Sequence, residues 1–128
     1  LTLQHFDNPG KPVQAGDIAE RQNIPIRFLE QILLNLKRSG FVLSRKGPGG
    51  GYLLARPPQA ITLGAVIRQL DGPLAPISCV SASGYMECGC PEPETCGLRD
   101  AFKQARDALA EVLDGTSFAD LRERHLRL

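Results

Sequence analysis

Hydrophobic residues in the first third of the chain recur at the spacing of two helices. Residues 13–22 bring Ile18 and Ala19 to one side and predict a short helix. The segment Asn23-Ile24-Pro25 ends it, because proline has no N–H to donate and is best tolerated at the first turn of a new helix. Further apolar positions recur at three and four residues and predict a second helix that ends at Gly40; they are Ile26, Leu29, Ile32, Leu33 and Leu36. Two helices joined by a tight turn predict a helix-turn-helix.

A pair of short strands follows these helices. Residues 41–44 and 52–55 have the apolar composition of strands. The Gly-Pro-Gly-Gly-Gly segment between them, residues 47–51, predicts a hairpin turn, and Arg56-Pro57-Pro58 ends the second strand. A hairpin directly after the second helix of a helix-turn-helix predicts the wing of a winged helix.

The second half of the chain predicts three more helices and a polar loop. Thr62 is placed to cap a helix over residues 63–70. Ser117 and Asp120 have the spacing of a capping box that opens a final helix. Between them, a heptad-like seam predicts a packing helix over residues 98–113; the seam positions are Leu98, Phe102, Ala105, Leu109 and Val112. The predicted fold class is mostly α with a small β wing.

Charge divides the chain into a basic and an acidic half. Residues 1–56 carry eight Lys/Arg against four Asp/Glu, a net +4, whereas residues 57–128 carry seven against ten, a net −3. A basic half is suited to a polyanion such as nucleic acid. No apolar run is long enough to span a bilayer and no signal segment is evident, so we expect a cytoplasmic protein. Residues 1–6 look like the end of a helix, so we also expect that the first helix is truncated.

The predicted helix-turn-helix and wing carry side chains suited to reading DNA. On the second helix, Arg27, Glu30 and Gln31 lie off the apolar stripe and are suited to guanine, cytosine and adenine edges respectively. The alternative is that they are ordinary solvent-facing residues. In the wing, Arg45 and Lys46 offer charge to phosphates or to a narrow minor groove, and the glycines let the backbone approach DNA. A phosphate-cradling loop is disfavoured, because the GxxxxGK[ST] order is absent and no helix follows.

Two segments resemble the signature of the Rrf2 family of bacterial transcription regulators, whose members include IscR, NsrR and CymR. They are Phe28-Leu29-Glu30-Gln31-Ile32-Leu33 and the wing sequence RKGPGGGYLL over residues 45–54. The resemblance implies a homodimeric repressor or activator that binds a pseudo-palindromic, double-stranded DNA operator. Glu30 matches the family's base-reading glutamate. The wing positions that meet the minor groove are matched by Arg45, Gly47, Pro48 and Gly49.

The resemblance covers nearly the whole chain and implies three segments. Residues 1–58 form the winged helix-turn-helix DNA-binding domain, with its N-terminal helix truncated. Residues 59–97 form a linker helix and a cysteine-rich loop. Residues 98–128 form a long dimerisation helix and a C-terminal helix.

All four cysteines lie in one loop with the spacing C-x8-C-x-C-x5-C; they are Cys79, Cys88, Cys90 and Cys96. Thiolates are soft donors that suit iron–sulfur clusters and zinc. The resemblance implies an iron–sulfur cluster, 2Fe-2S ahead of 4Fe-4S, since IscR-like members hold one with three cysteines and one other ligand. The chain departs from that pattern, because Cys88 is extra and Arg99 stands where the IscR-type histidine is expected. Cys88 is then the candidate for the fourth ligand of an all-cysteine set.

Other interpretations of the cysteines stay open. In one, the thiols close into disulfides under oxidant and the regulator is redox-switched without a cluster. In another they hold structural zinc, although C-x-C is tighter than the usual C-x2-C knuckle. Further alternatives are unligated thiols in a regulator that answers to a partner protein, and an iron–sulfur carrier protein. An enzyme is not expected, because no Ser-His-Asp set, Cys-His set or carboxylate pair forms a catalytic motif.

Overall fold

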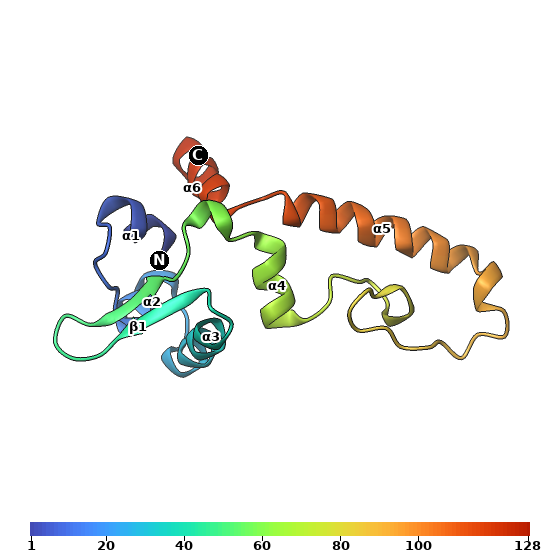
Figure 1. The fold of residues 1–128 in the computed structure, drawn as a ribbon, viewed down its shortest axis with the longest axis horizontal. Coiled ribbons are helices and arrows are strands. Elements are labelled where there is room, and N and C mark those ends of the chain that lie inside the picture. The colour runs from blue at the N-terminus through green and yellow to red at the C-terminus, as the bar shows by residue number, and fades with distance from the viewer. The chain divides into compact units, whose positions relative to one another are not determined.

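The computed structural model describes residues 1–128, which form two compact units. The first unit comprises Leu1–Ile61 and Ser117–Leu128, and the second comprises Thr62–Thr116. The elements of the first unit are α1 (Thr2–Asp7), α2 (Ala15–Gln22), α3 (Ile26–Arg38), β1 (Val42–Arg45), β2 (Gly51–Leu54), the short 3-10 helix η1 (Pro58–Ala60) and α6 (Phe118–Arg127). Those of the second unit are α4 (Leu63–Asp71), the 3-10 helices η2 (Ser78–Val80) and η3 (Pro93–Thr95), and α5 (Gly97–Asp114). A mostly helical chain with a small two-stranded antiparallel sheet confirms the predicted fold class (Figure 1).

The last helix groups with the first elements of the chain. The predicted segment 98–128 includes both α5 and α6, whereas in the structure α6 lies in the same unit as α1, α2 and α3. The functional roles of the three expected segments stay predictions. No helix of the structure has both the length and the apolar character needed to cross a membrane.

The turn between α2 and α3 is formed as the sequence predicted. Asn23 adopts a left-handed backbone conformation with φ 52°, which asparagine tolerates better than most residues. The Ile24 N–H donates to the Ala19 carbonyl oxygen at 2.9 Å and closes the end of α2, and Pro25 is the N-cap of α3. The buried core of this helix pair consists of Ala19, Leu29 and Leu33.

Helix α2 begins later than predicted, at Ala15, because Val13 pairs with the sheet instead. The Val13 N–H donates to the Tyr52 carbonyl oxygen at 2.9 Å, and the Tyr52 N–H donates to the Val13 carbonyl oxygen at 2.8 Å. A Cβ on Gly51 would overlap the Val13 carbonyl group. Glycine at position 51 therefore lets the two chain segments approach closely enough to pair.

The predicted hairpin is confirmed, with both strands displaced by one residue toward the turn. Strands β1 and β2 pair antiparallel, with Val42 opposite Leu54 and Arg45 opposite Gly51. The chain continues close to its partner beyond the strands, since the Ala55 N–H donates to the Phe41 carbonyl oxygen at 2.9 Å.

Helix α6 packs against α1 in the first unit (Figure 1). The guanidinium group of Arg122 lies 4.3 Å from the centre of the Phe6 ring, a cation–π contact, and 3.9 Å from the Asp7 carboxylate. At the start of α6, the Asp120 N–H donates to Ser117 Oγ at 3.1 Å. The Ser117 N–H donates back to Asp120 Oδ2 at 2.8 Å, so the predicted capping box is confirmed.

An ion pair joins α4 to α5 in the second unit. Arg68 donates two hydrogen bonds to the Asp114 carboxylate, at 2.5 and 2.8 Å. A Cβ on Gly64 would overlap that carboxylate, so glycine leaves room for the Asp114 side chain beside α4. The predicted cap of α4 is confirmed, because Thr62 Oγ1 accepts the Ala65 N–H at 3.1 Å.

The predicted packing helix is α5, with 18 residues. Its heptad-like seam is largely uncovered: Leu98 is 64% exposed, Leu109 42% and Val112 63%. The chain does not bury this apolar seam itself.

Candidate functional site

The expected DNA-reading side chains lie on the exposed side of α3. Leu29 and Leu33 are 5% and 2% exposed and mark the buried side of the helix. Arg27, Glu30 and Gln31 are all exposed. Because a helix turns by about 100° per residue, these three share one broad face, away from the core. Their contacts with DNA stay a prediction.

The wing tip has a backbone that depends on glycine. Gly47 and Gly49 have φ angles of 88° and 74°, a region that L side chains disfavour. At Gly50 a Cβ would overlap the Arg45 carbonyl oxygen across the turn. Close approach to DNA is the predicted reason for these glycines, and the geometry of the turn supplies a second reason. The residues exposed at the tip are Arg45, Lys46, Gly47, Pro48 and Gly49.

The four cysteines line one pocket of about 260 Å³ in the second unit. Cys79 comes from η2, Cys88 and Cys90 from the following loop, and Cys96 is the N-cap of α5. All four are free thiols. No three Cys, His, Asp or Glu side chains of the chain meet in an arrangement that could hold a metal ion. The fold thus gathers the predicted ligands around one space without setting them in coordination geometry.

Two of these thiols interact directly. Hydrogen bonds from Cys90, first from its backbone N–H and then from its thiol, lower the pKa of Cys88, and the positive charge of Arg99 adds to the effect. The same thiol contact raises the pKa of Cys90, and the charges of Cys96 and Cys79 raise it further. As pH rises, the first proton lost by this pair therefore comes from Cys88.

Arg99 forms a cationic wall of the cysteine pocket. Its backbone N–H donates to Cys96 Sγ at 3.4 Å. Its Nη1 donates to the Pro93 carbonyl oxygen at 3.4 Å and lies 4.0 Å from the Glu94 carboxylate. Its Nε is buried and has no hydrogen-bond partner. Because a buried donor without an acceptor costs free energy, this wall favours an anionic acceptor.

One soft side chain of this pocket was not predicted from the sequence. Met86 contributes to the lining together with Glu87. A thioether is a weak, polarisable donor. The signal available in the sequence was the position of Met86, two residues before Cys88.

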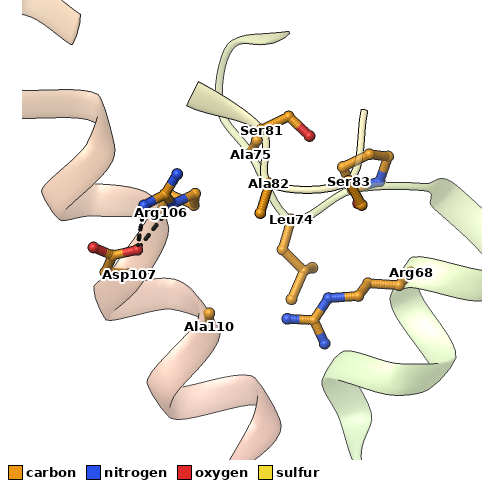
Figure 2. Close-up of a pocket in the computed structure, with 10 residues that line it drawn as sticks. Arg68, Leu74, Ala75, Ser81, Ala82, Ser83, Arg106, Asp107 and Ala110 are labelled. Atoms are coloured by element: carbon orange, nitrogen blue, oxygen red, sulfur yellow. Dashed lines mark hydrogen bonds and ion pairs between the residues drawn. The ribbon is translucent and has the colours of Figure 1, made fainter. Parts of the chain in front are cut away.

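A second pocket, of about 180 Å³, lies between α4, α5 and residues 73–83 (Figure 2). Arg68 and Arg106 contribute guanidinium groups, and both are already paired. Arg68 belongs to the α4–α5 ion pair. Arg106 lies 2.8 Å from the Asp107 carboxylate and donates to the Val80 carbonyl oxygen at 2.5 Å. This pocket is a junction that ties the loop after α4 to α5, and no sequence spacing indicated it.

The comparisons with known proteins agree on one family. The chain matches the Rrf2 model, described as an iron-dependent transcriptional regulator, over residues 1–124. It is 36% identical to the HTH-type transcriptional regulator CymR of Bacillus subtilis over 110 residues. The aligned stretch covers 86% of this chain and 72% of that protein. It is 34% identical over 110 residues to the HTH-type transcriptional regulator IscR of Erwinia tasmaniensis, with 86% of this chain covered but only 64% of that protein. The solved structure of CymR, the global cysteine regulator of B. subtilis, superposes with a TM-score of 0.77 at 34% identity and covers 97% of this chain and 85% of that chain.

These matches confirm the resemblance carried by FLEQIL and RKGPGGGYLL, and they extend over the helix-turn-helix, the wing, the cysteine loop and α5. The relatives are transcriptional regulators and not enzymes, and regulators of this family bind DNA. The chain belongs to the Rrf2 family of transcriptional regulators.

Proposed function

We propose that this chain is a DNA-binding regulator whose operator affinity is controlled by an iron–sulfur cluster held in the cysteine pocket. The observation that supports this proposal best is the gathering of four thiols, from three separate stretches of chain, around one pocket beside the first turn of α5. Family membership alone is a weaker support, because the relatives include both IscR and CymR.

The chemistry of the pocket suits such a group. The ligands would be Cys79, Cys88, Cys90 and Cys96, soft sulfur donors of the kind that hold 2Fe-2S clusters. When bound, the cluster would supply reversible redox chemistry and sensitivity to oxidants. Arg99 would donate its N–H groups to sulfur and favour a net negative charge at the site.

The start of α5 connects the pocket to the assembly of the regulator. Cys96 is the N-cap of α5, and Leu98 both lines the cysteine pocket and opens the exposed seam. We assign this seam to a homodimer, in which two winged helices face the two halves of an operator. A change in how Cys96 is held alters the first turn of α5 and so the packing of the seam. Operator binding and occupancy of the pocket are then coupled reciprocally.

On the DNA side, α3 would enter the major groove and the wing would meet the backbone and the minor groove. The residues assigned to these contacts are Arg27, Glu30, Gln31, Arg45, Lys46, Gly47, Pro48 and Gly49.

The test uses protein purified without oxygen and an operator selected from a random duplex library. Iron and acid-labile sulfide are measured per protomer, and the visible spectrum is recorded before and after exposure to air. We expect near-stoichiometric iron and sulfide, with loss of colour and a change in operator affinity occurring together. Operator binding itself should weaken steeply with salt and keep its sequence preference.

The control is a variant with Ser at all four cysteine positions. It is expected to bind duplex DNA but to lose both the colour and the response to air. A colourless wild type whose operator affinity ignores air would contradict cluster control, and zinc in place of iron in the metal analysis would assign the site to zinc. A wild type that selects no duplex would contradict the regulator itself and favour a carrier.

A thiol–disulfide switch without a cluster is the second candidate, favoured by the Cys88–Cys90 contact. One thiol of this pair has a lowered pKa and the other a raised one, so one is the better nucleophile. Oxidation of metal-free protein should then form a disulfide, with loss of two hydrogens by mass spectrometry. Operator affinity should change with it and recover on addition of a thiol reductant.

A further inference from the structure

Helix α3 exposes three large apolar side chains, and Phe28 is the most exposed of them. Phe28 is 62% exposed. The exposed polar residues that flank it along the helix are Arg27, Glu30 and Gln31. These polar residues are the ones predicted to read bases, whereas Phe28 has no predicted role of its own.

Helix geometry puts Phe28 well inside this exposed face. Viewed down the helix axis, Gln31 lies on the side opposite the midpoint between the buried Leu29 and Leu33. Gln31 therefore marks the centre of the exposed face. At about 100° per residue, Phe28 lies about 60° from Gln31 around the helix, and Glu30 lies about 100° from it. Phe28 is therefore closer to the centre than Glu30, the residue that matches the family's base-reading glutamate.

The position of Phe28 along α3 also favours a contact with bases. Phe28 lies in the first turn of the helix, which begins at Ile26. In helix-turn-helix proteins the N-terminal residues of the second helix reach the base edges. The major groove offers one apolar group to such a side chain, the C5-methyl group of thymine, and phenylalanine is among the residues that contact it.

We propose that Phe28 is a specificity-determining residue that packs against a thymine methyl group in each half of the operator. This proposal rests on operator binding by α3, and it is independent of what the cysteine pocket holds. Burial of the ring against the methyl group replaces contact of both with water, which is favourable in proportion to the apolar area covered.

The experiment replaces thymines of the selected operator, one position at a time, with deoxyuridine, which lacks only the methyl group. Affinities for wild type and Phe28→Ala are measured by fluorescence anisotropy at fixed salt. At the contacted position we expect deoxyuridine to weaken wild-type binding about fourfold, the effect of one methyl group. Phe28→Ala should bind the thymine operator more weakly and show no further loss with deoxyuridine there.

Two variants keep the result interpretable. Leu34→Ala removes another exposed apolar side chain of α3, 39% exposed, and should retain the deoxyuridine penalty. Phe28→Leu keeps an apolar side chain and should recover part of the penalty. Circular dichroism checks the fold of each, and Phe28→Ala is expected to fold because the side chain is exposed.

Two outcomes overturn the proposal: no thymine position gives a penalty with wild type, or the penalty persists undiminished in Phe28→Ala. Either outcome is compatible with normal operator selection by the wild type. In that case the proposed regulator function is retained and only the role of Phe28 is lost. If wild type selects no duplex at all, operator binding and the role of Phe28 are both overturned.

Discussion

Gly50 shows how tightly the wing backbone folds on itself. A Cβ at this position would overlap the carbonyl oxygens of Arg45 and Gly47, which are backbone atoms and cannot rotate away. We expect Gly50→Ala to lower the free energy of unfolding by about 1–3 kcal/mol, the usual cost of overpacking, as measured by urea denaturation. Gly16→Ala is the matched control, because no atom lies within 4 Å of a Cβ there and alanine favours the helix. Equal losses in both variants would contradict this explanation.

The contact between Cys88 and Cys90 predicts an order of thiol reactivity. Because hydrogen bonds from Cys90 lower the pKa of Cys88, the Cys88 thiolate forms at lower pH, and iodoacetamide should modify Cys88 before Cys90 in metal-free protein. Cys90→Ala removes the thiol donor but keeps the backbone N–H, so the rate–pH profile of Cys88 should move to higher pH. Peptide mass spectrometry at several pH values measures these rates.

Cys79→Ala is the control for this measurement, because Cys79 is not among the groups that lower the pKa of Cys88. In Cys79→Ala, the rate–pH profile of Cys88 modification should match that of wild type. A Cys88 profile that is unchanged in Cys90→Ala would show that the thiol contact does not set its reactivity.

At the scale of elements, the helices were predictable because their signals are local. Apolar spacing, the Thr62 cap and the Ser117 capping box all act within a few residues of themselves, and each agrees with the structure. The start of α2 was not predictable, because Val13 pairs with Tyr52, far along the chain. The cysteine pocket depends on the path of an irregular loop without periodicity. The four thiols could be recognised in the sequence as candidate ligands or redox groups. The positions of Met86 and Arg99 in the pocket walls could not be predicted, because they depend on the path of the loop.

The α4–α5 ion pair makes a prediction about pH. Hydrogen bonds from Arg68 lower the pKa of Asp114. The pair therefore stabilises the fold above the unfolded-state pKa of Asp114, and this contribution is lost as pH falls through the lowered folded-state pKa. Both side chains are more than a third exposed, so solvent screens the pair and we expect Asp114→Asn to cost at most about 1 kcal/mol at neutral pH.

Urea denaturation of wild type and Asp114→Asn at neutral and strongly acid pH measures this difference. It should shrink with added salt and disappear in acid, where Asp114 is protonated in both states. A difference that persists in acid would mean that the variant acts through packing near Gly64, not through charge.

At the scale of the whole molecule, the seam of α5 is the proposed connection between the pocket and the homodimer. Leu98, Leu109 and Val112 recur on one side of the helix and stay exposed, although burying such residues is worth about 1.5–3 kcal/mol each. A second copy of the chain would cover them, and two basic N-terminal halves would then face one operator.

Leu109→Lys places a charge in the middle of this seam, and we expect it to convert a dimer into a monomer in analytical ultracentrifugation. Gln104→Lys adds the same charge at an exposed position on another side of α5 and should leave the dimer intact. Because a dimer binds both halves of an operator at once, Leu109→Lys should lose most of its preference for a full operator over a half-site, while its half-site affinity stays near that of wild type. Two results would contradict this role of the seam: a wild type that is monomeric at the concentrations of the DNA-binding assay, or a Leu109→Lys variant that remains dimeric. Either result would mean that the seam does not form a dimer and does not couple the cysteine pocket to operator binding.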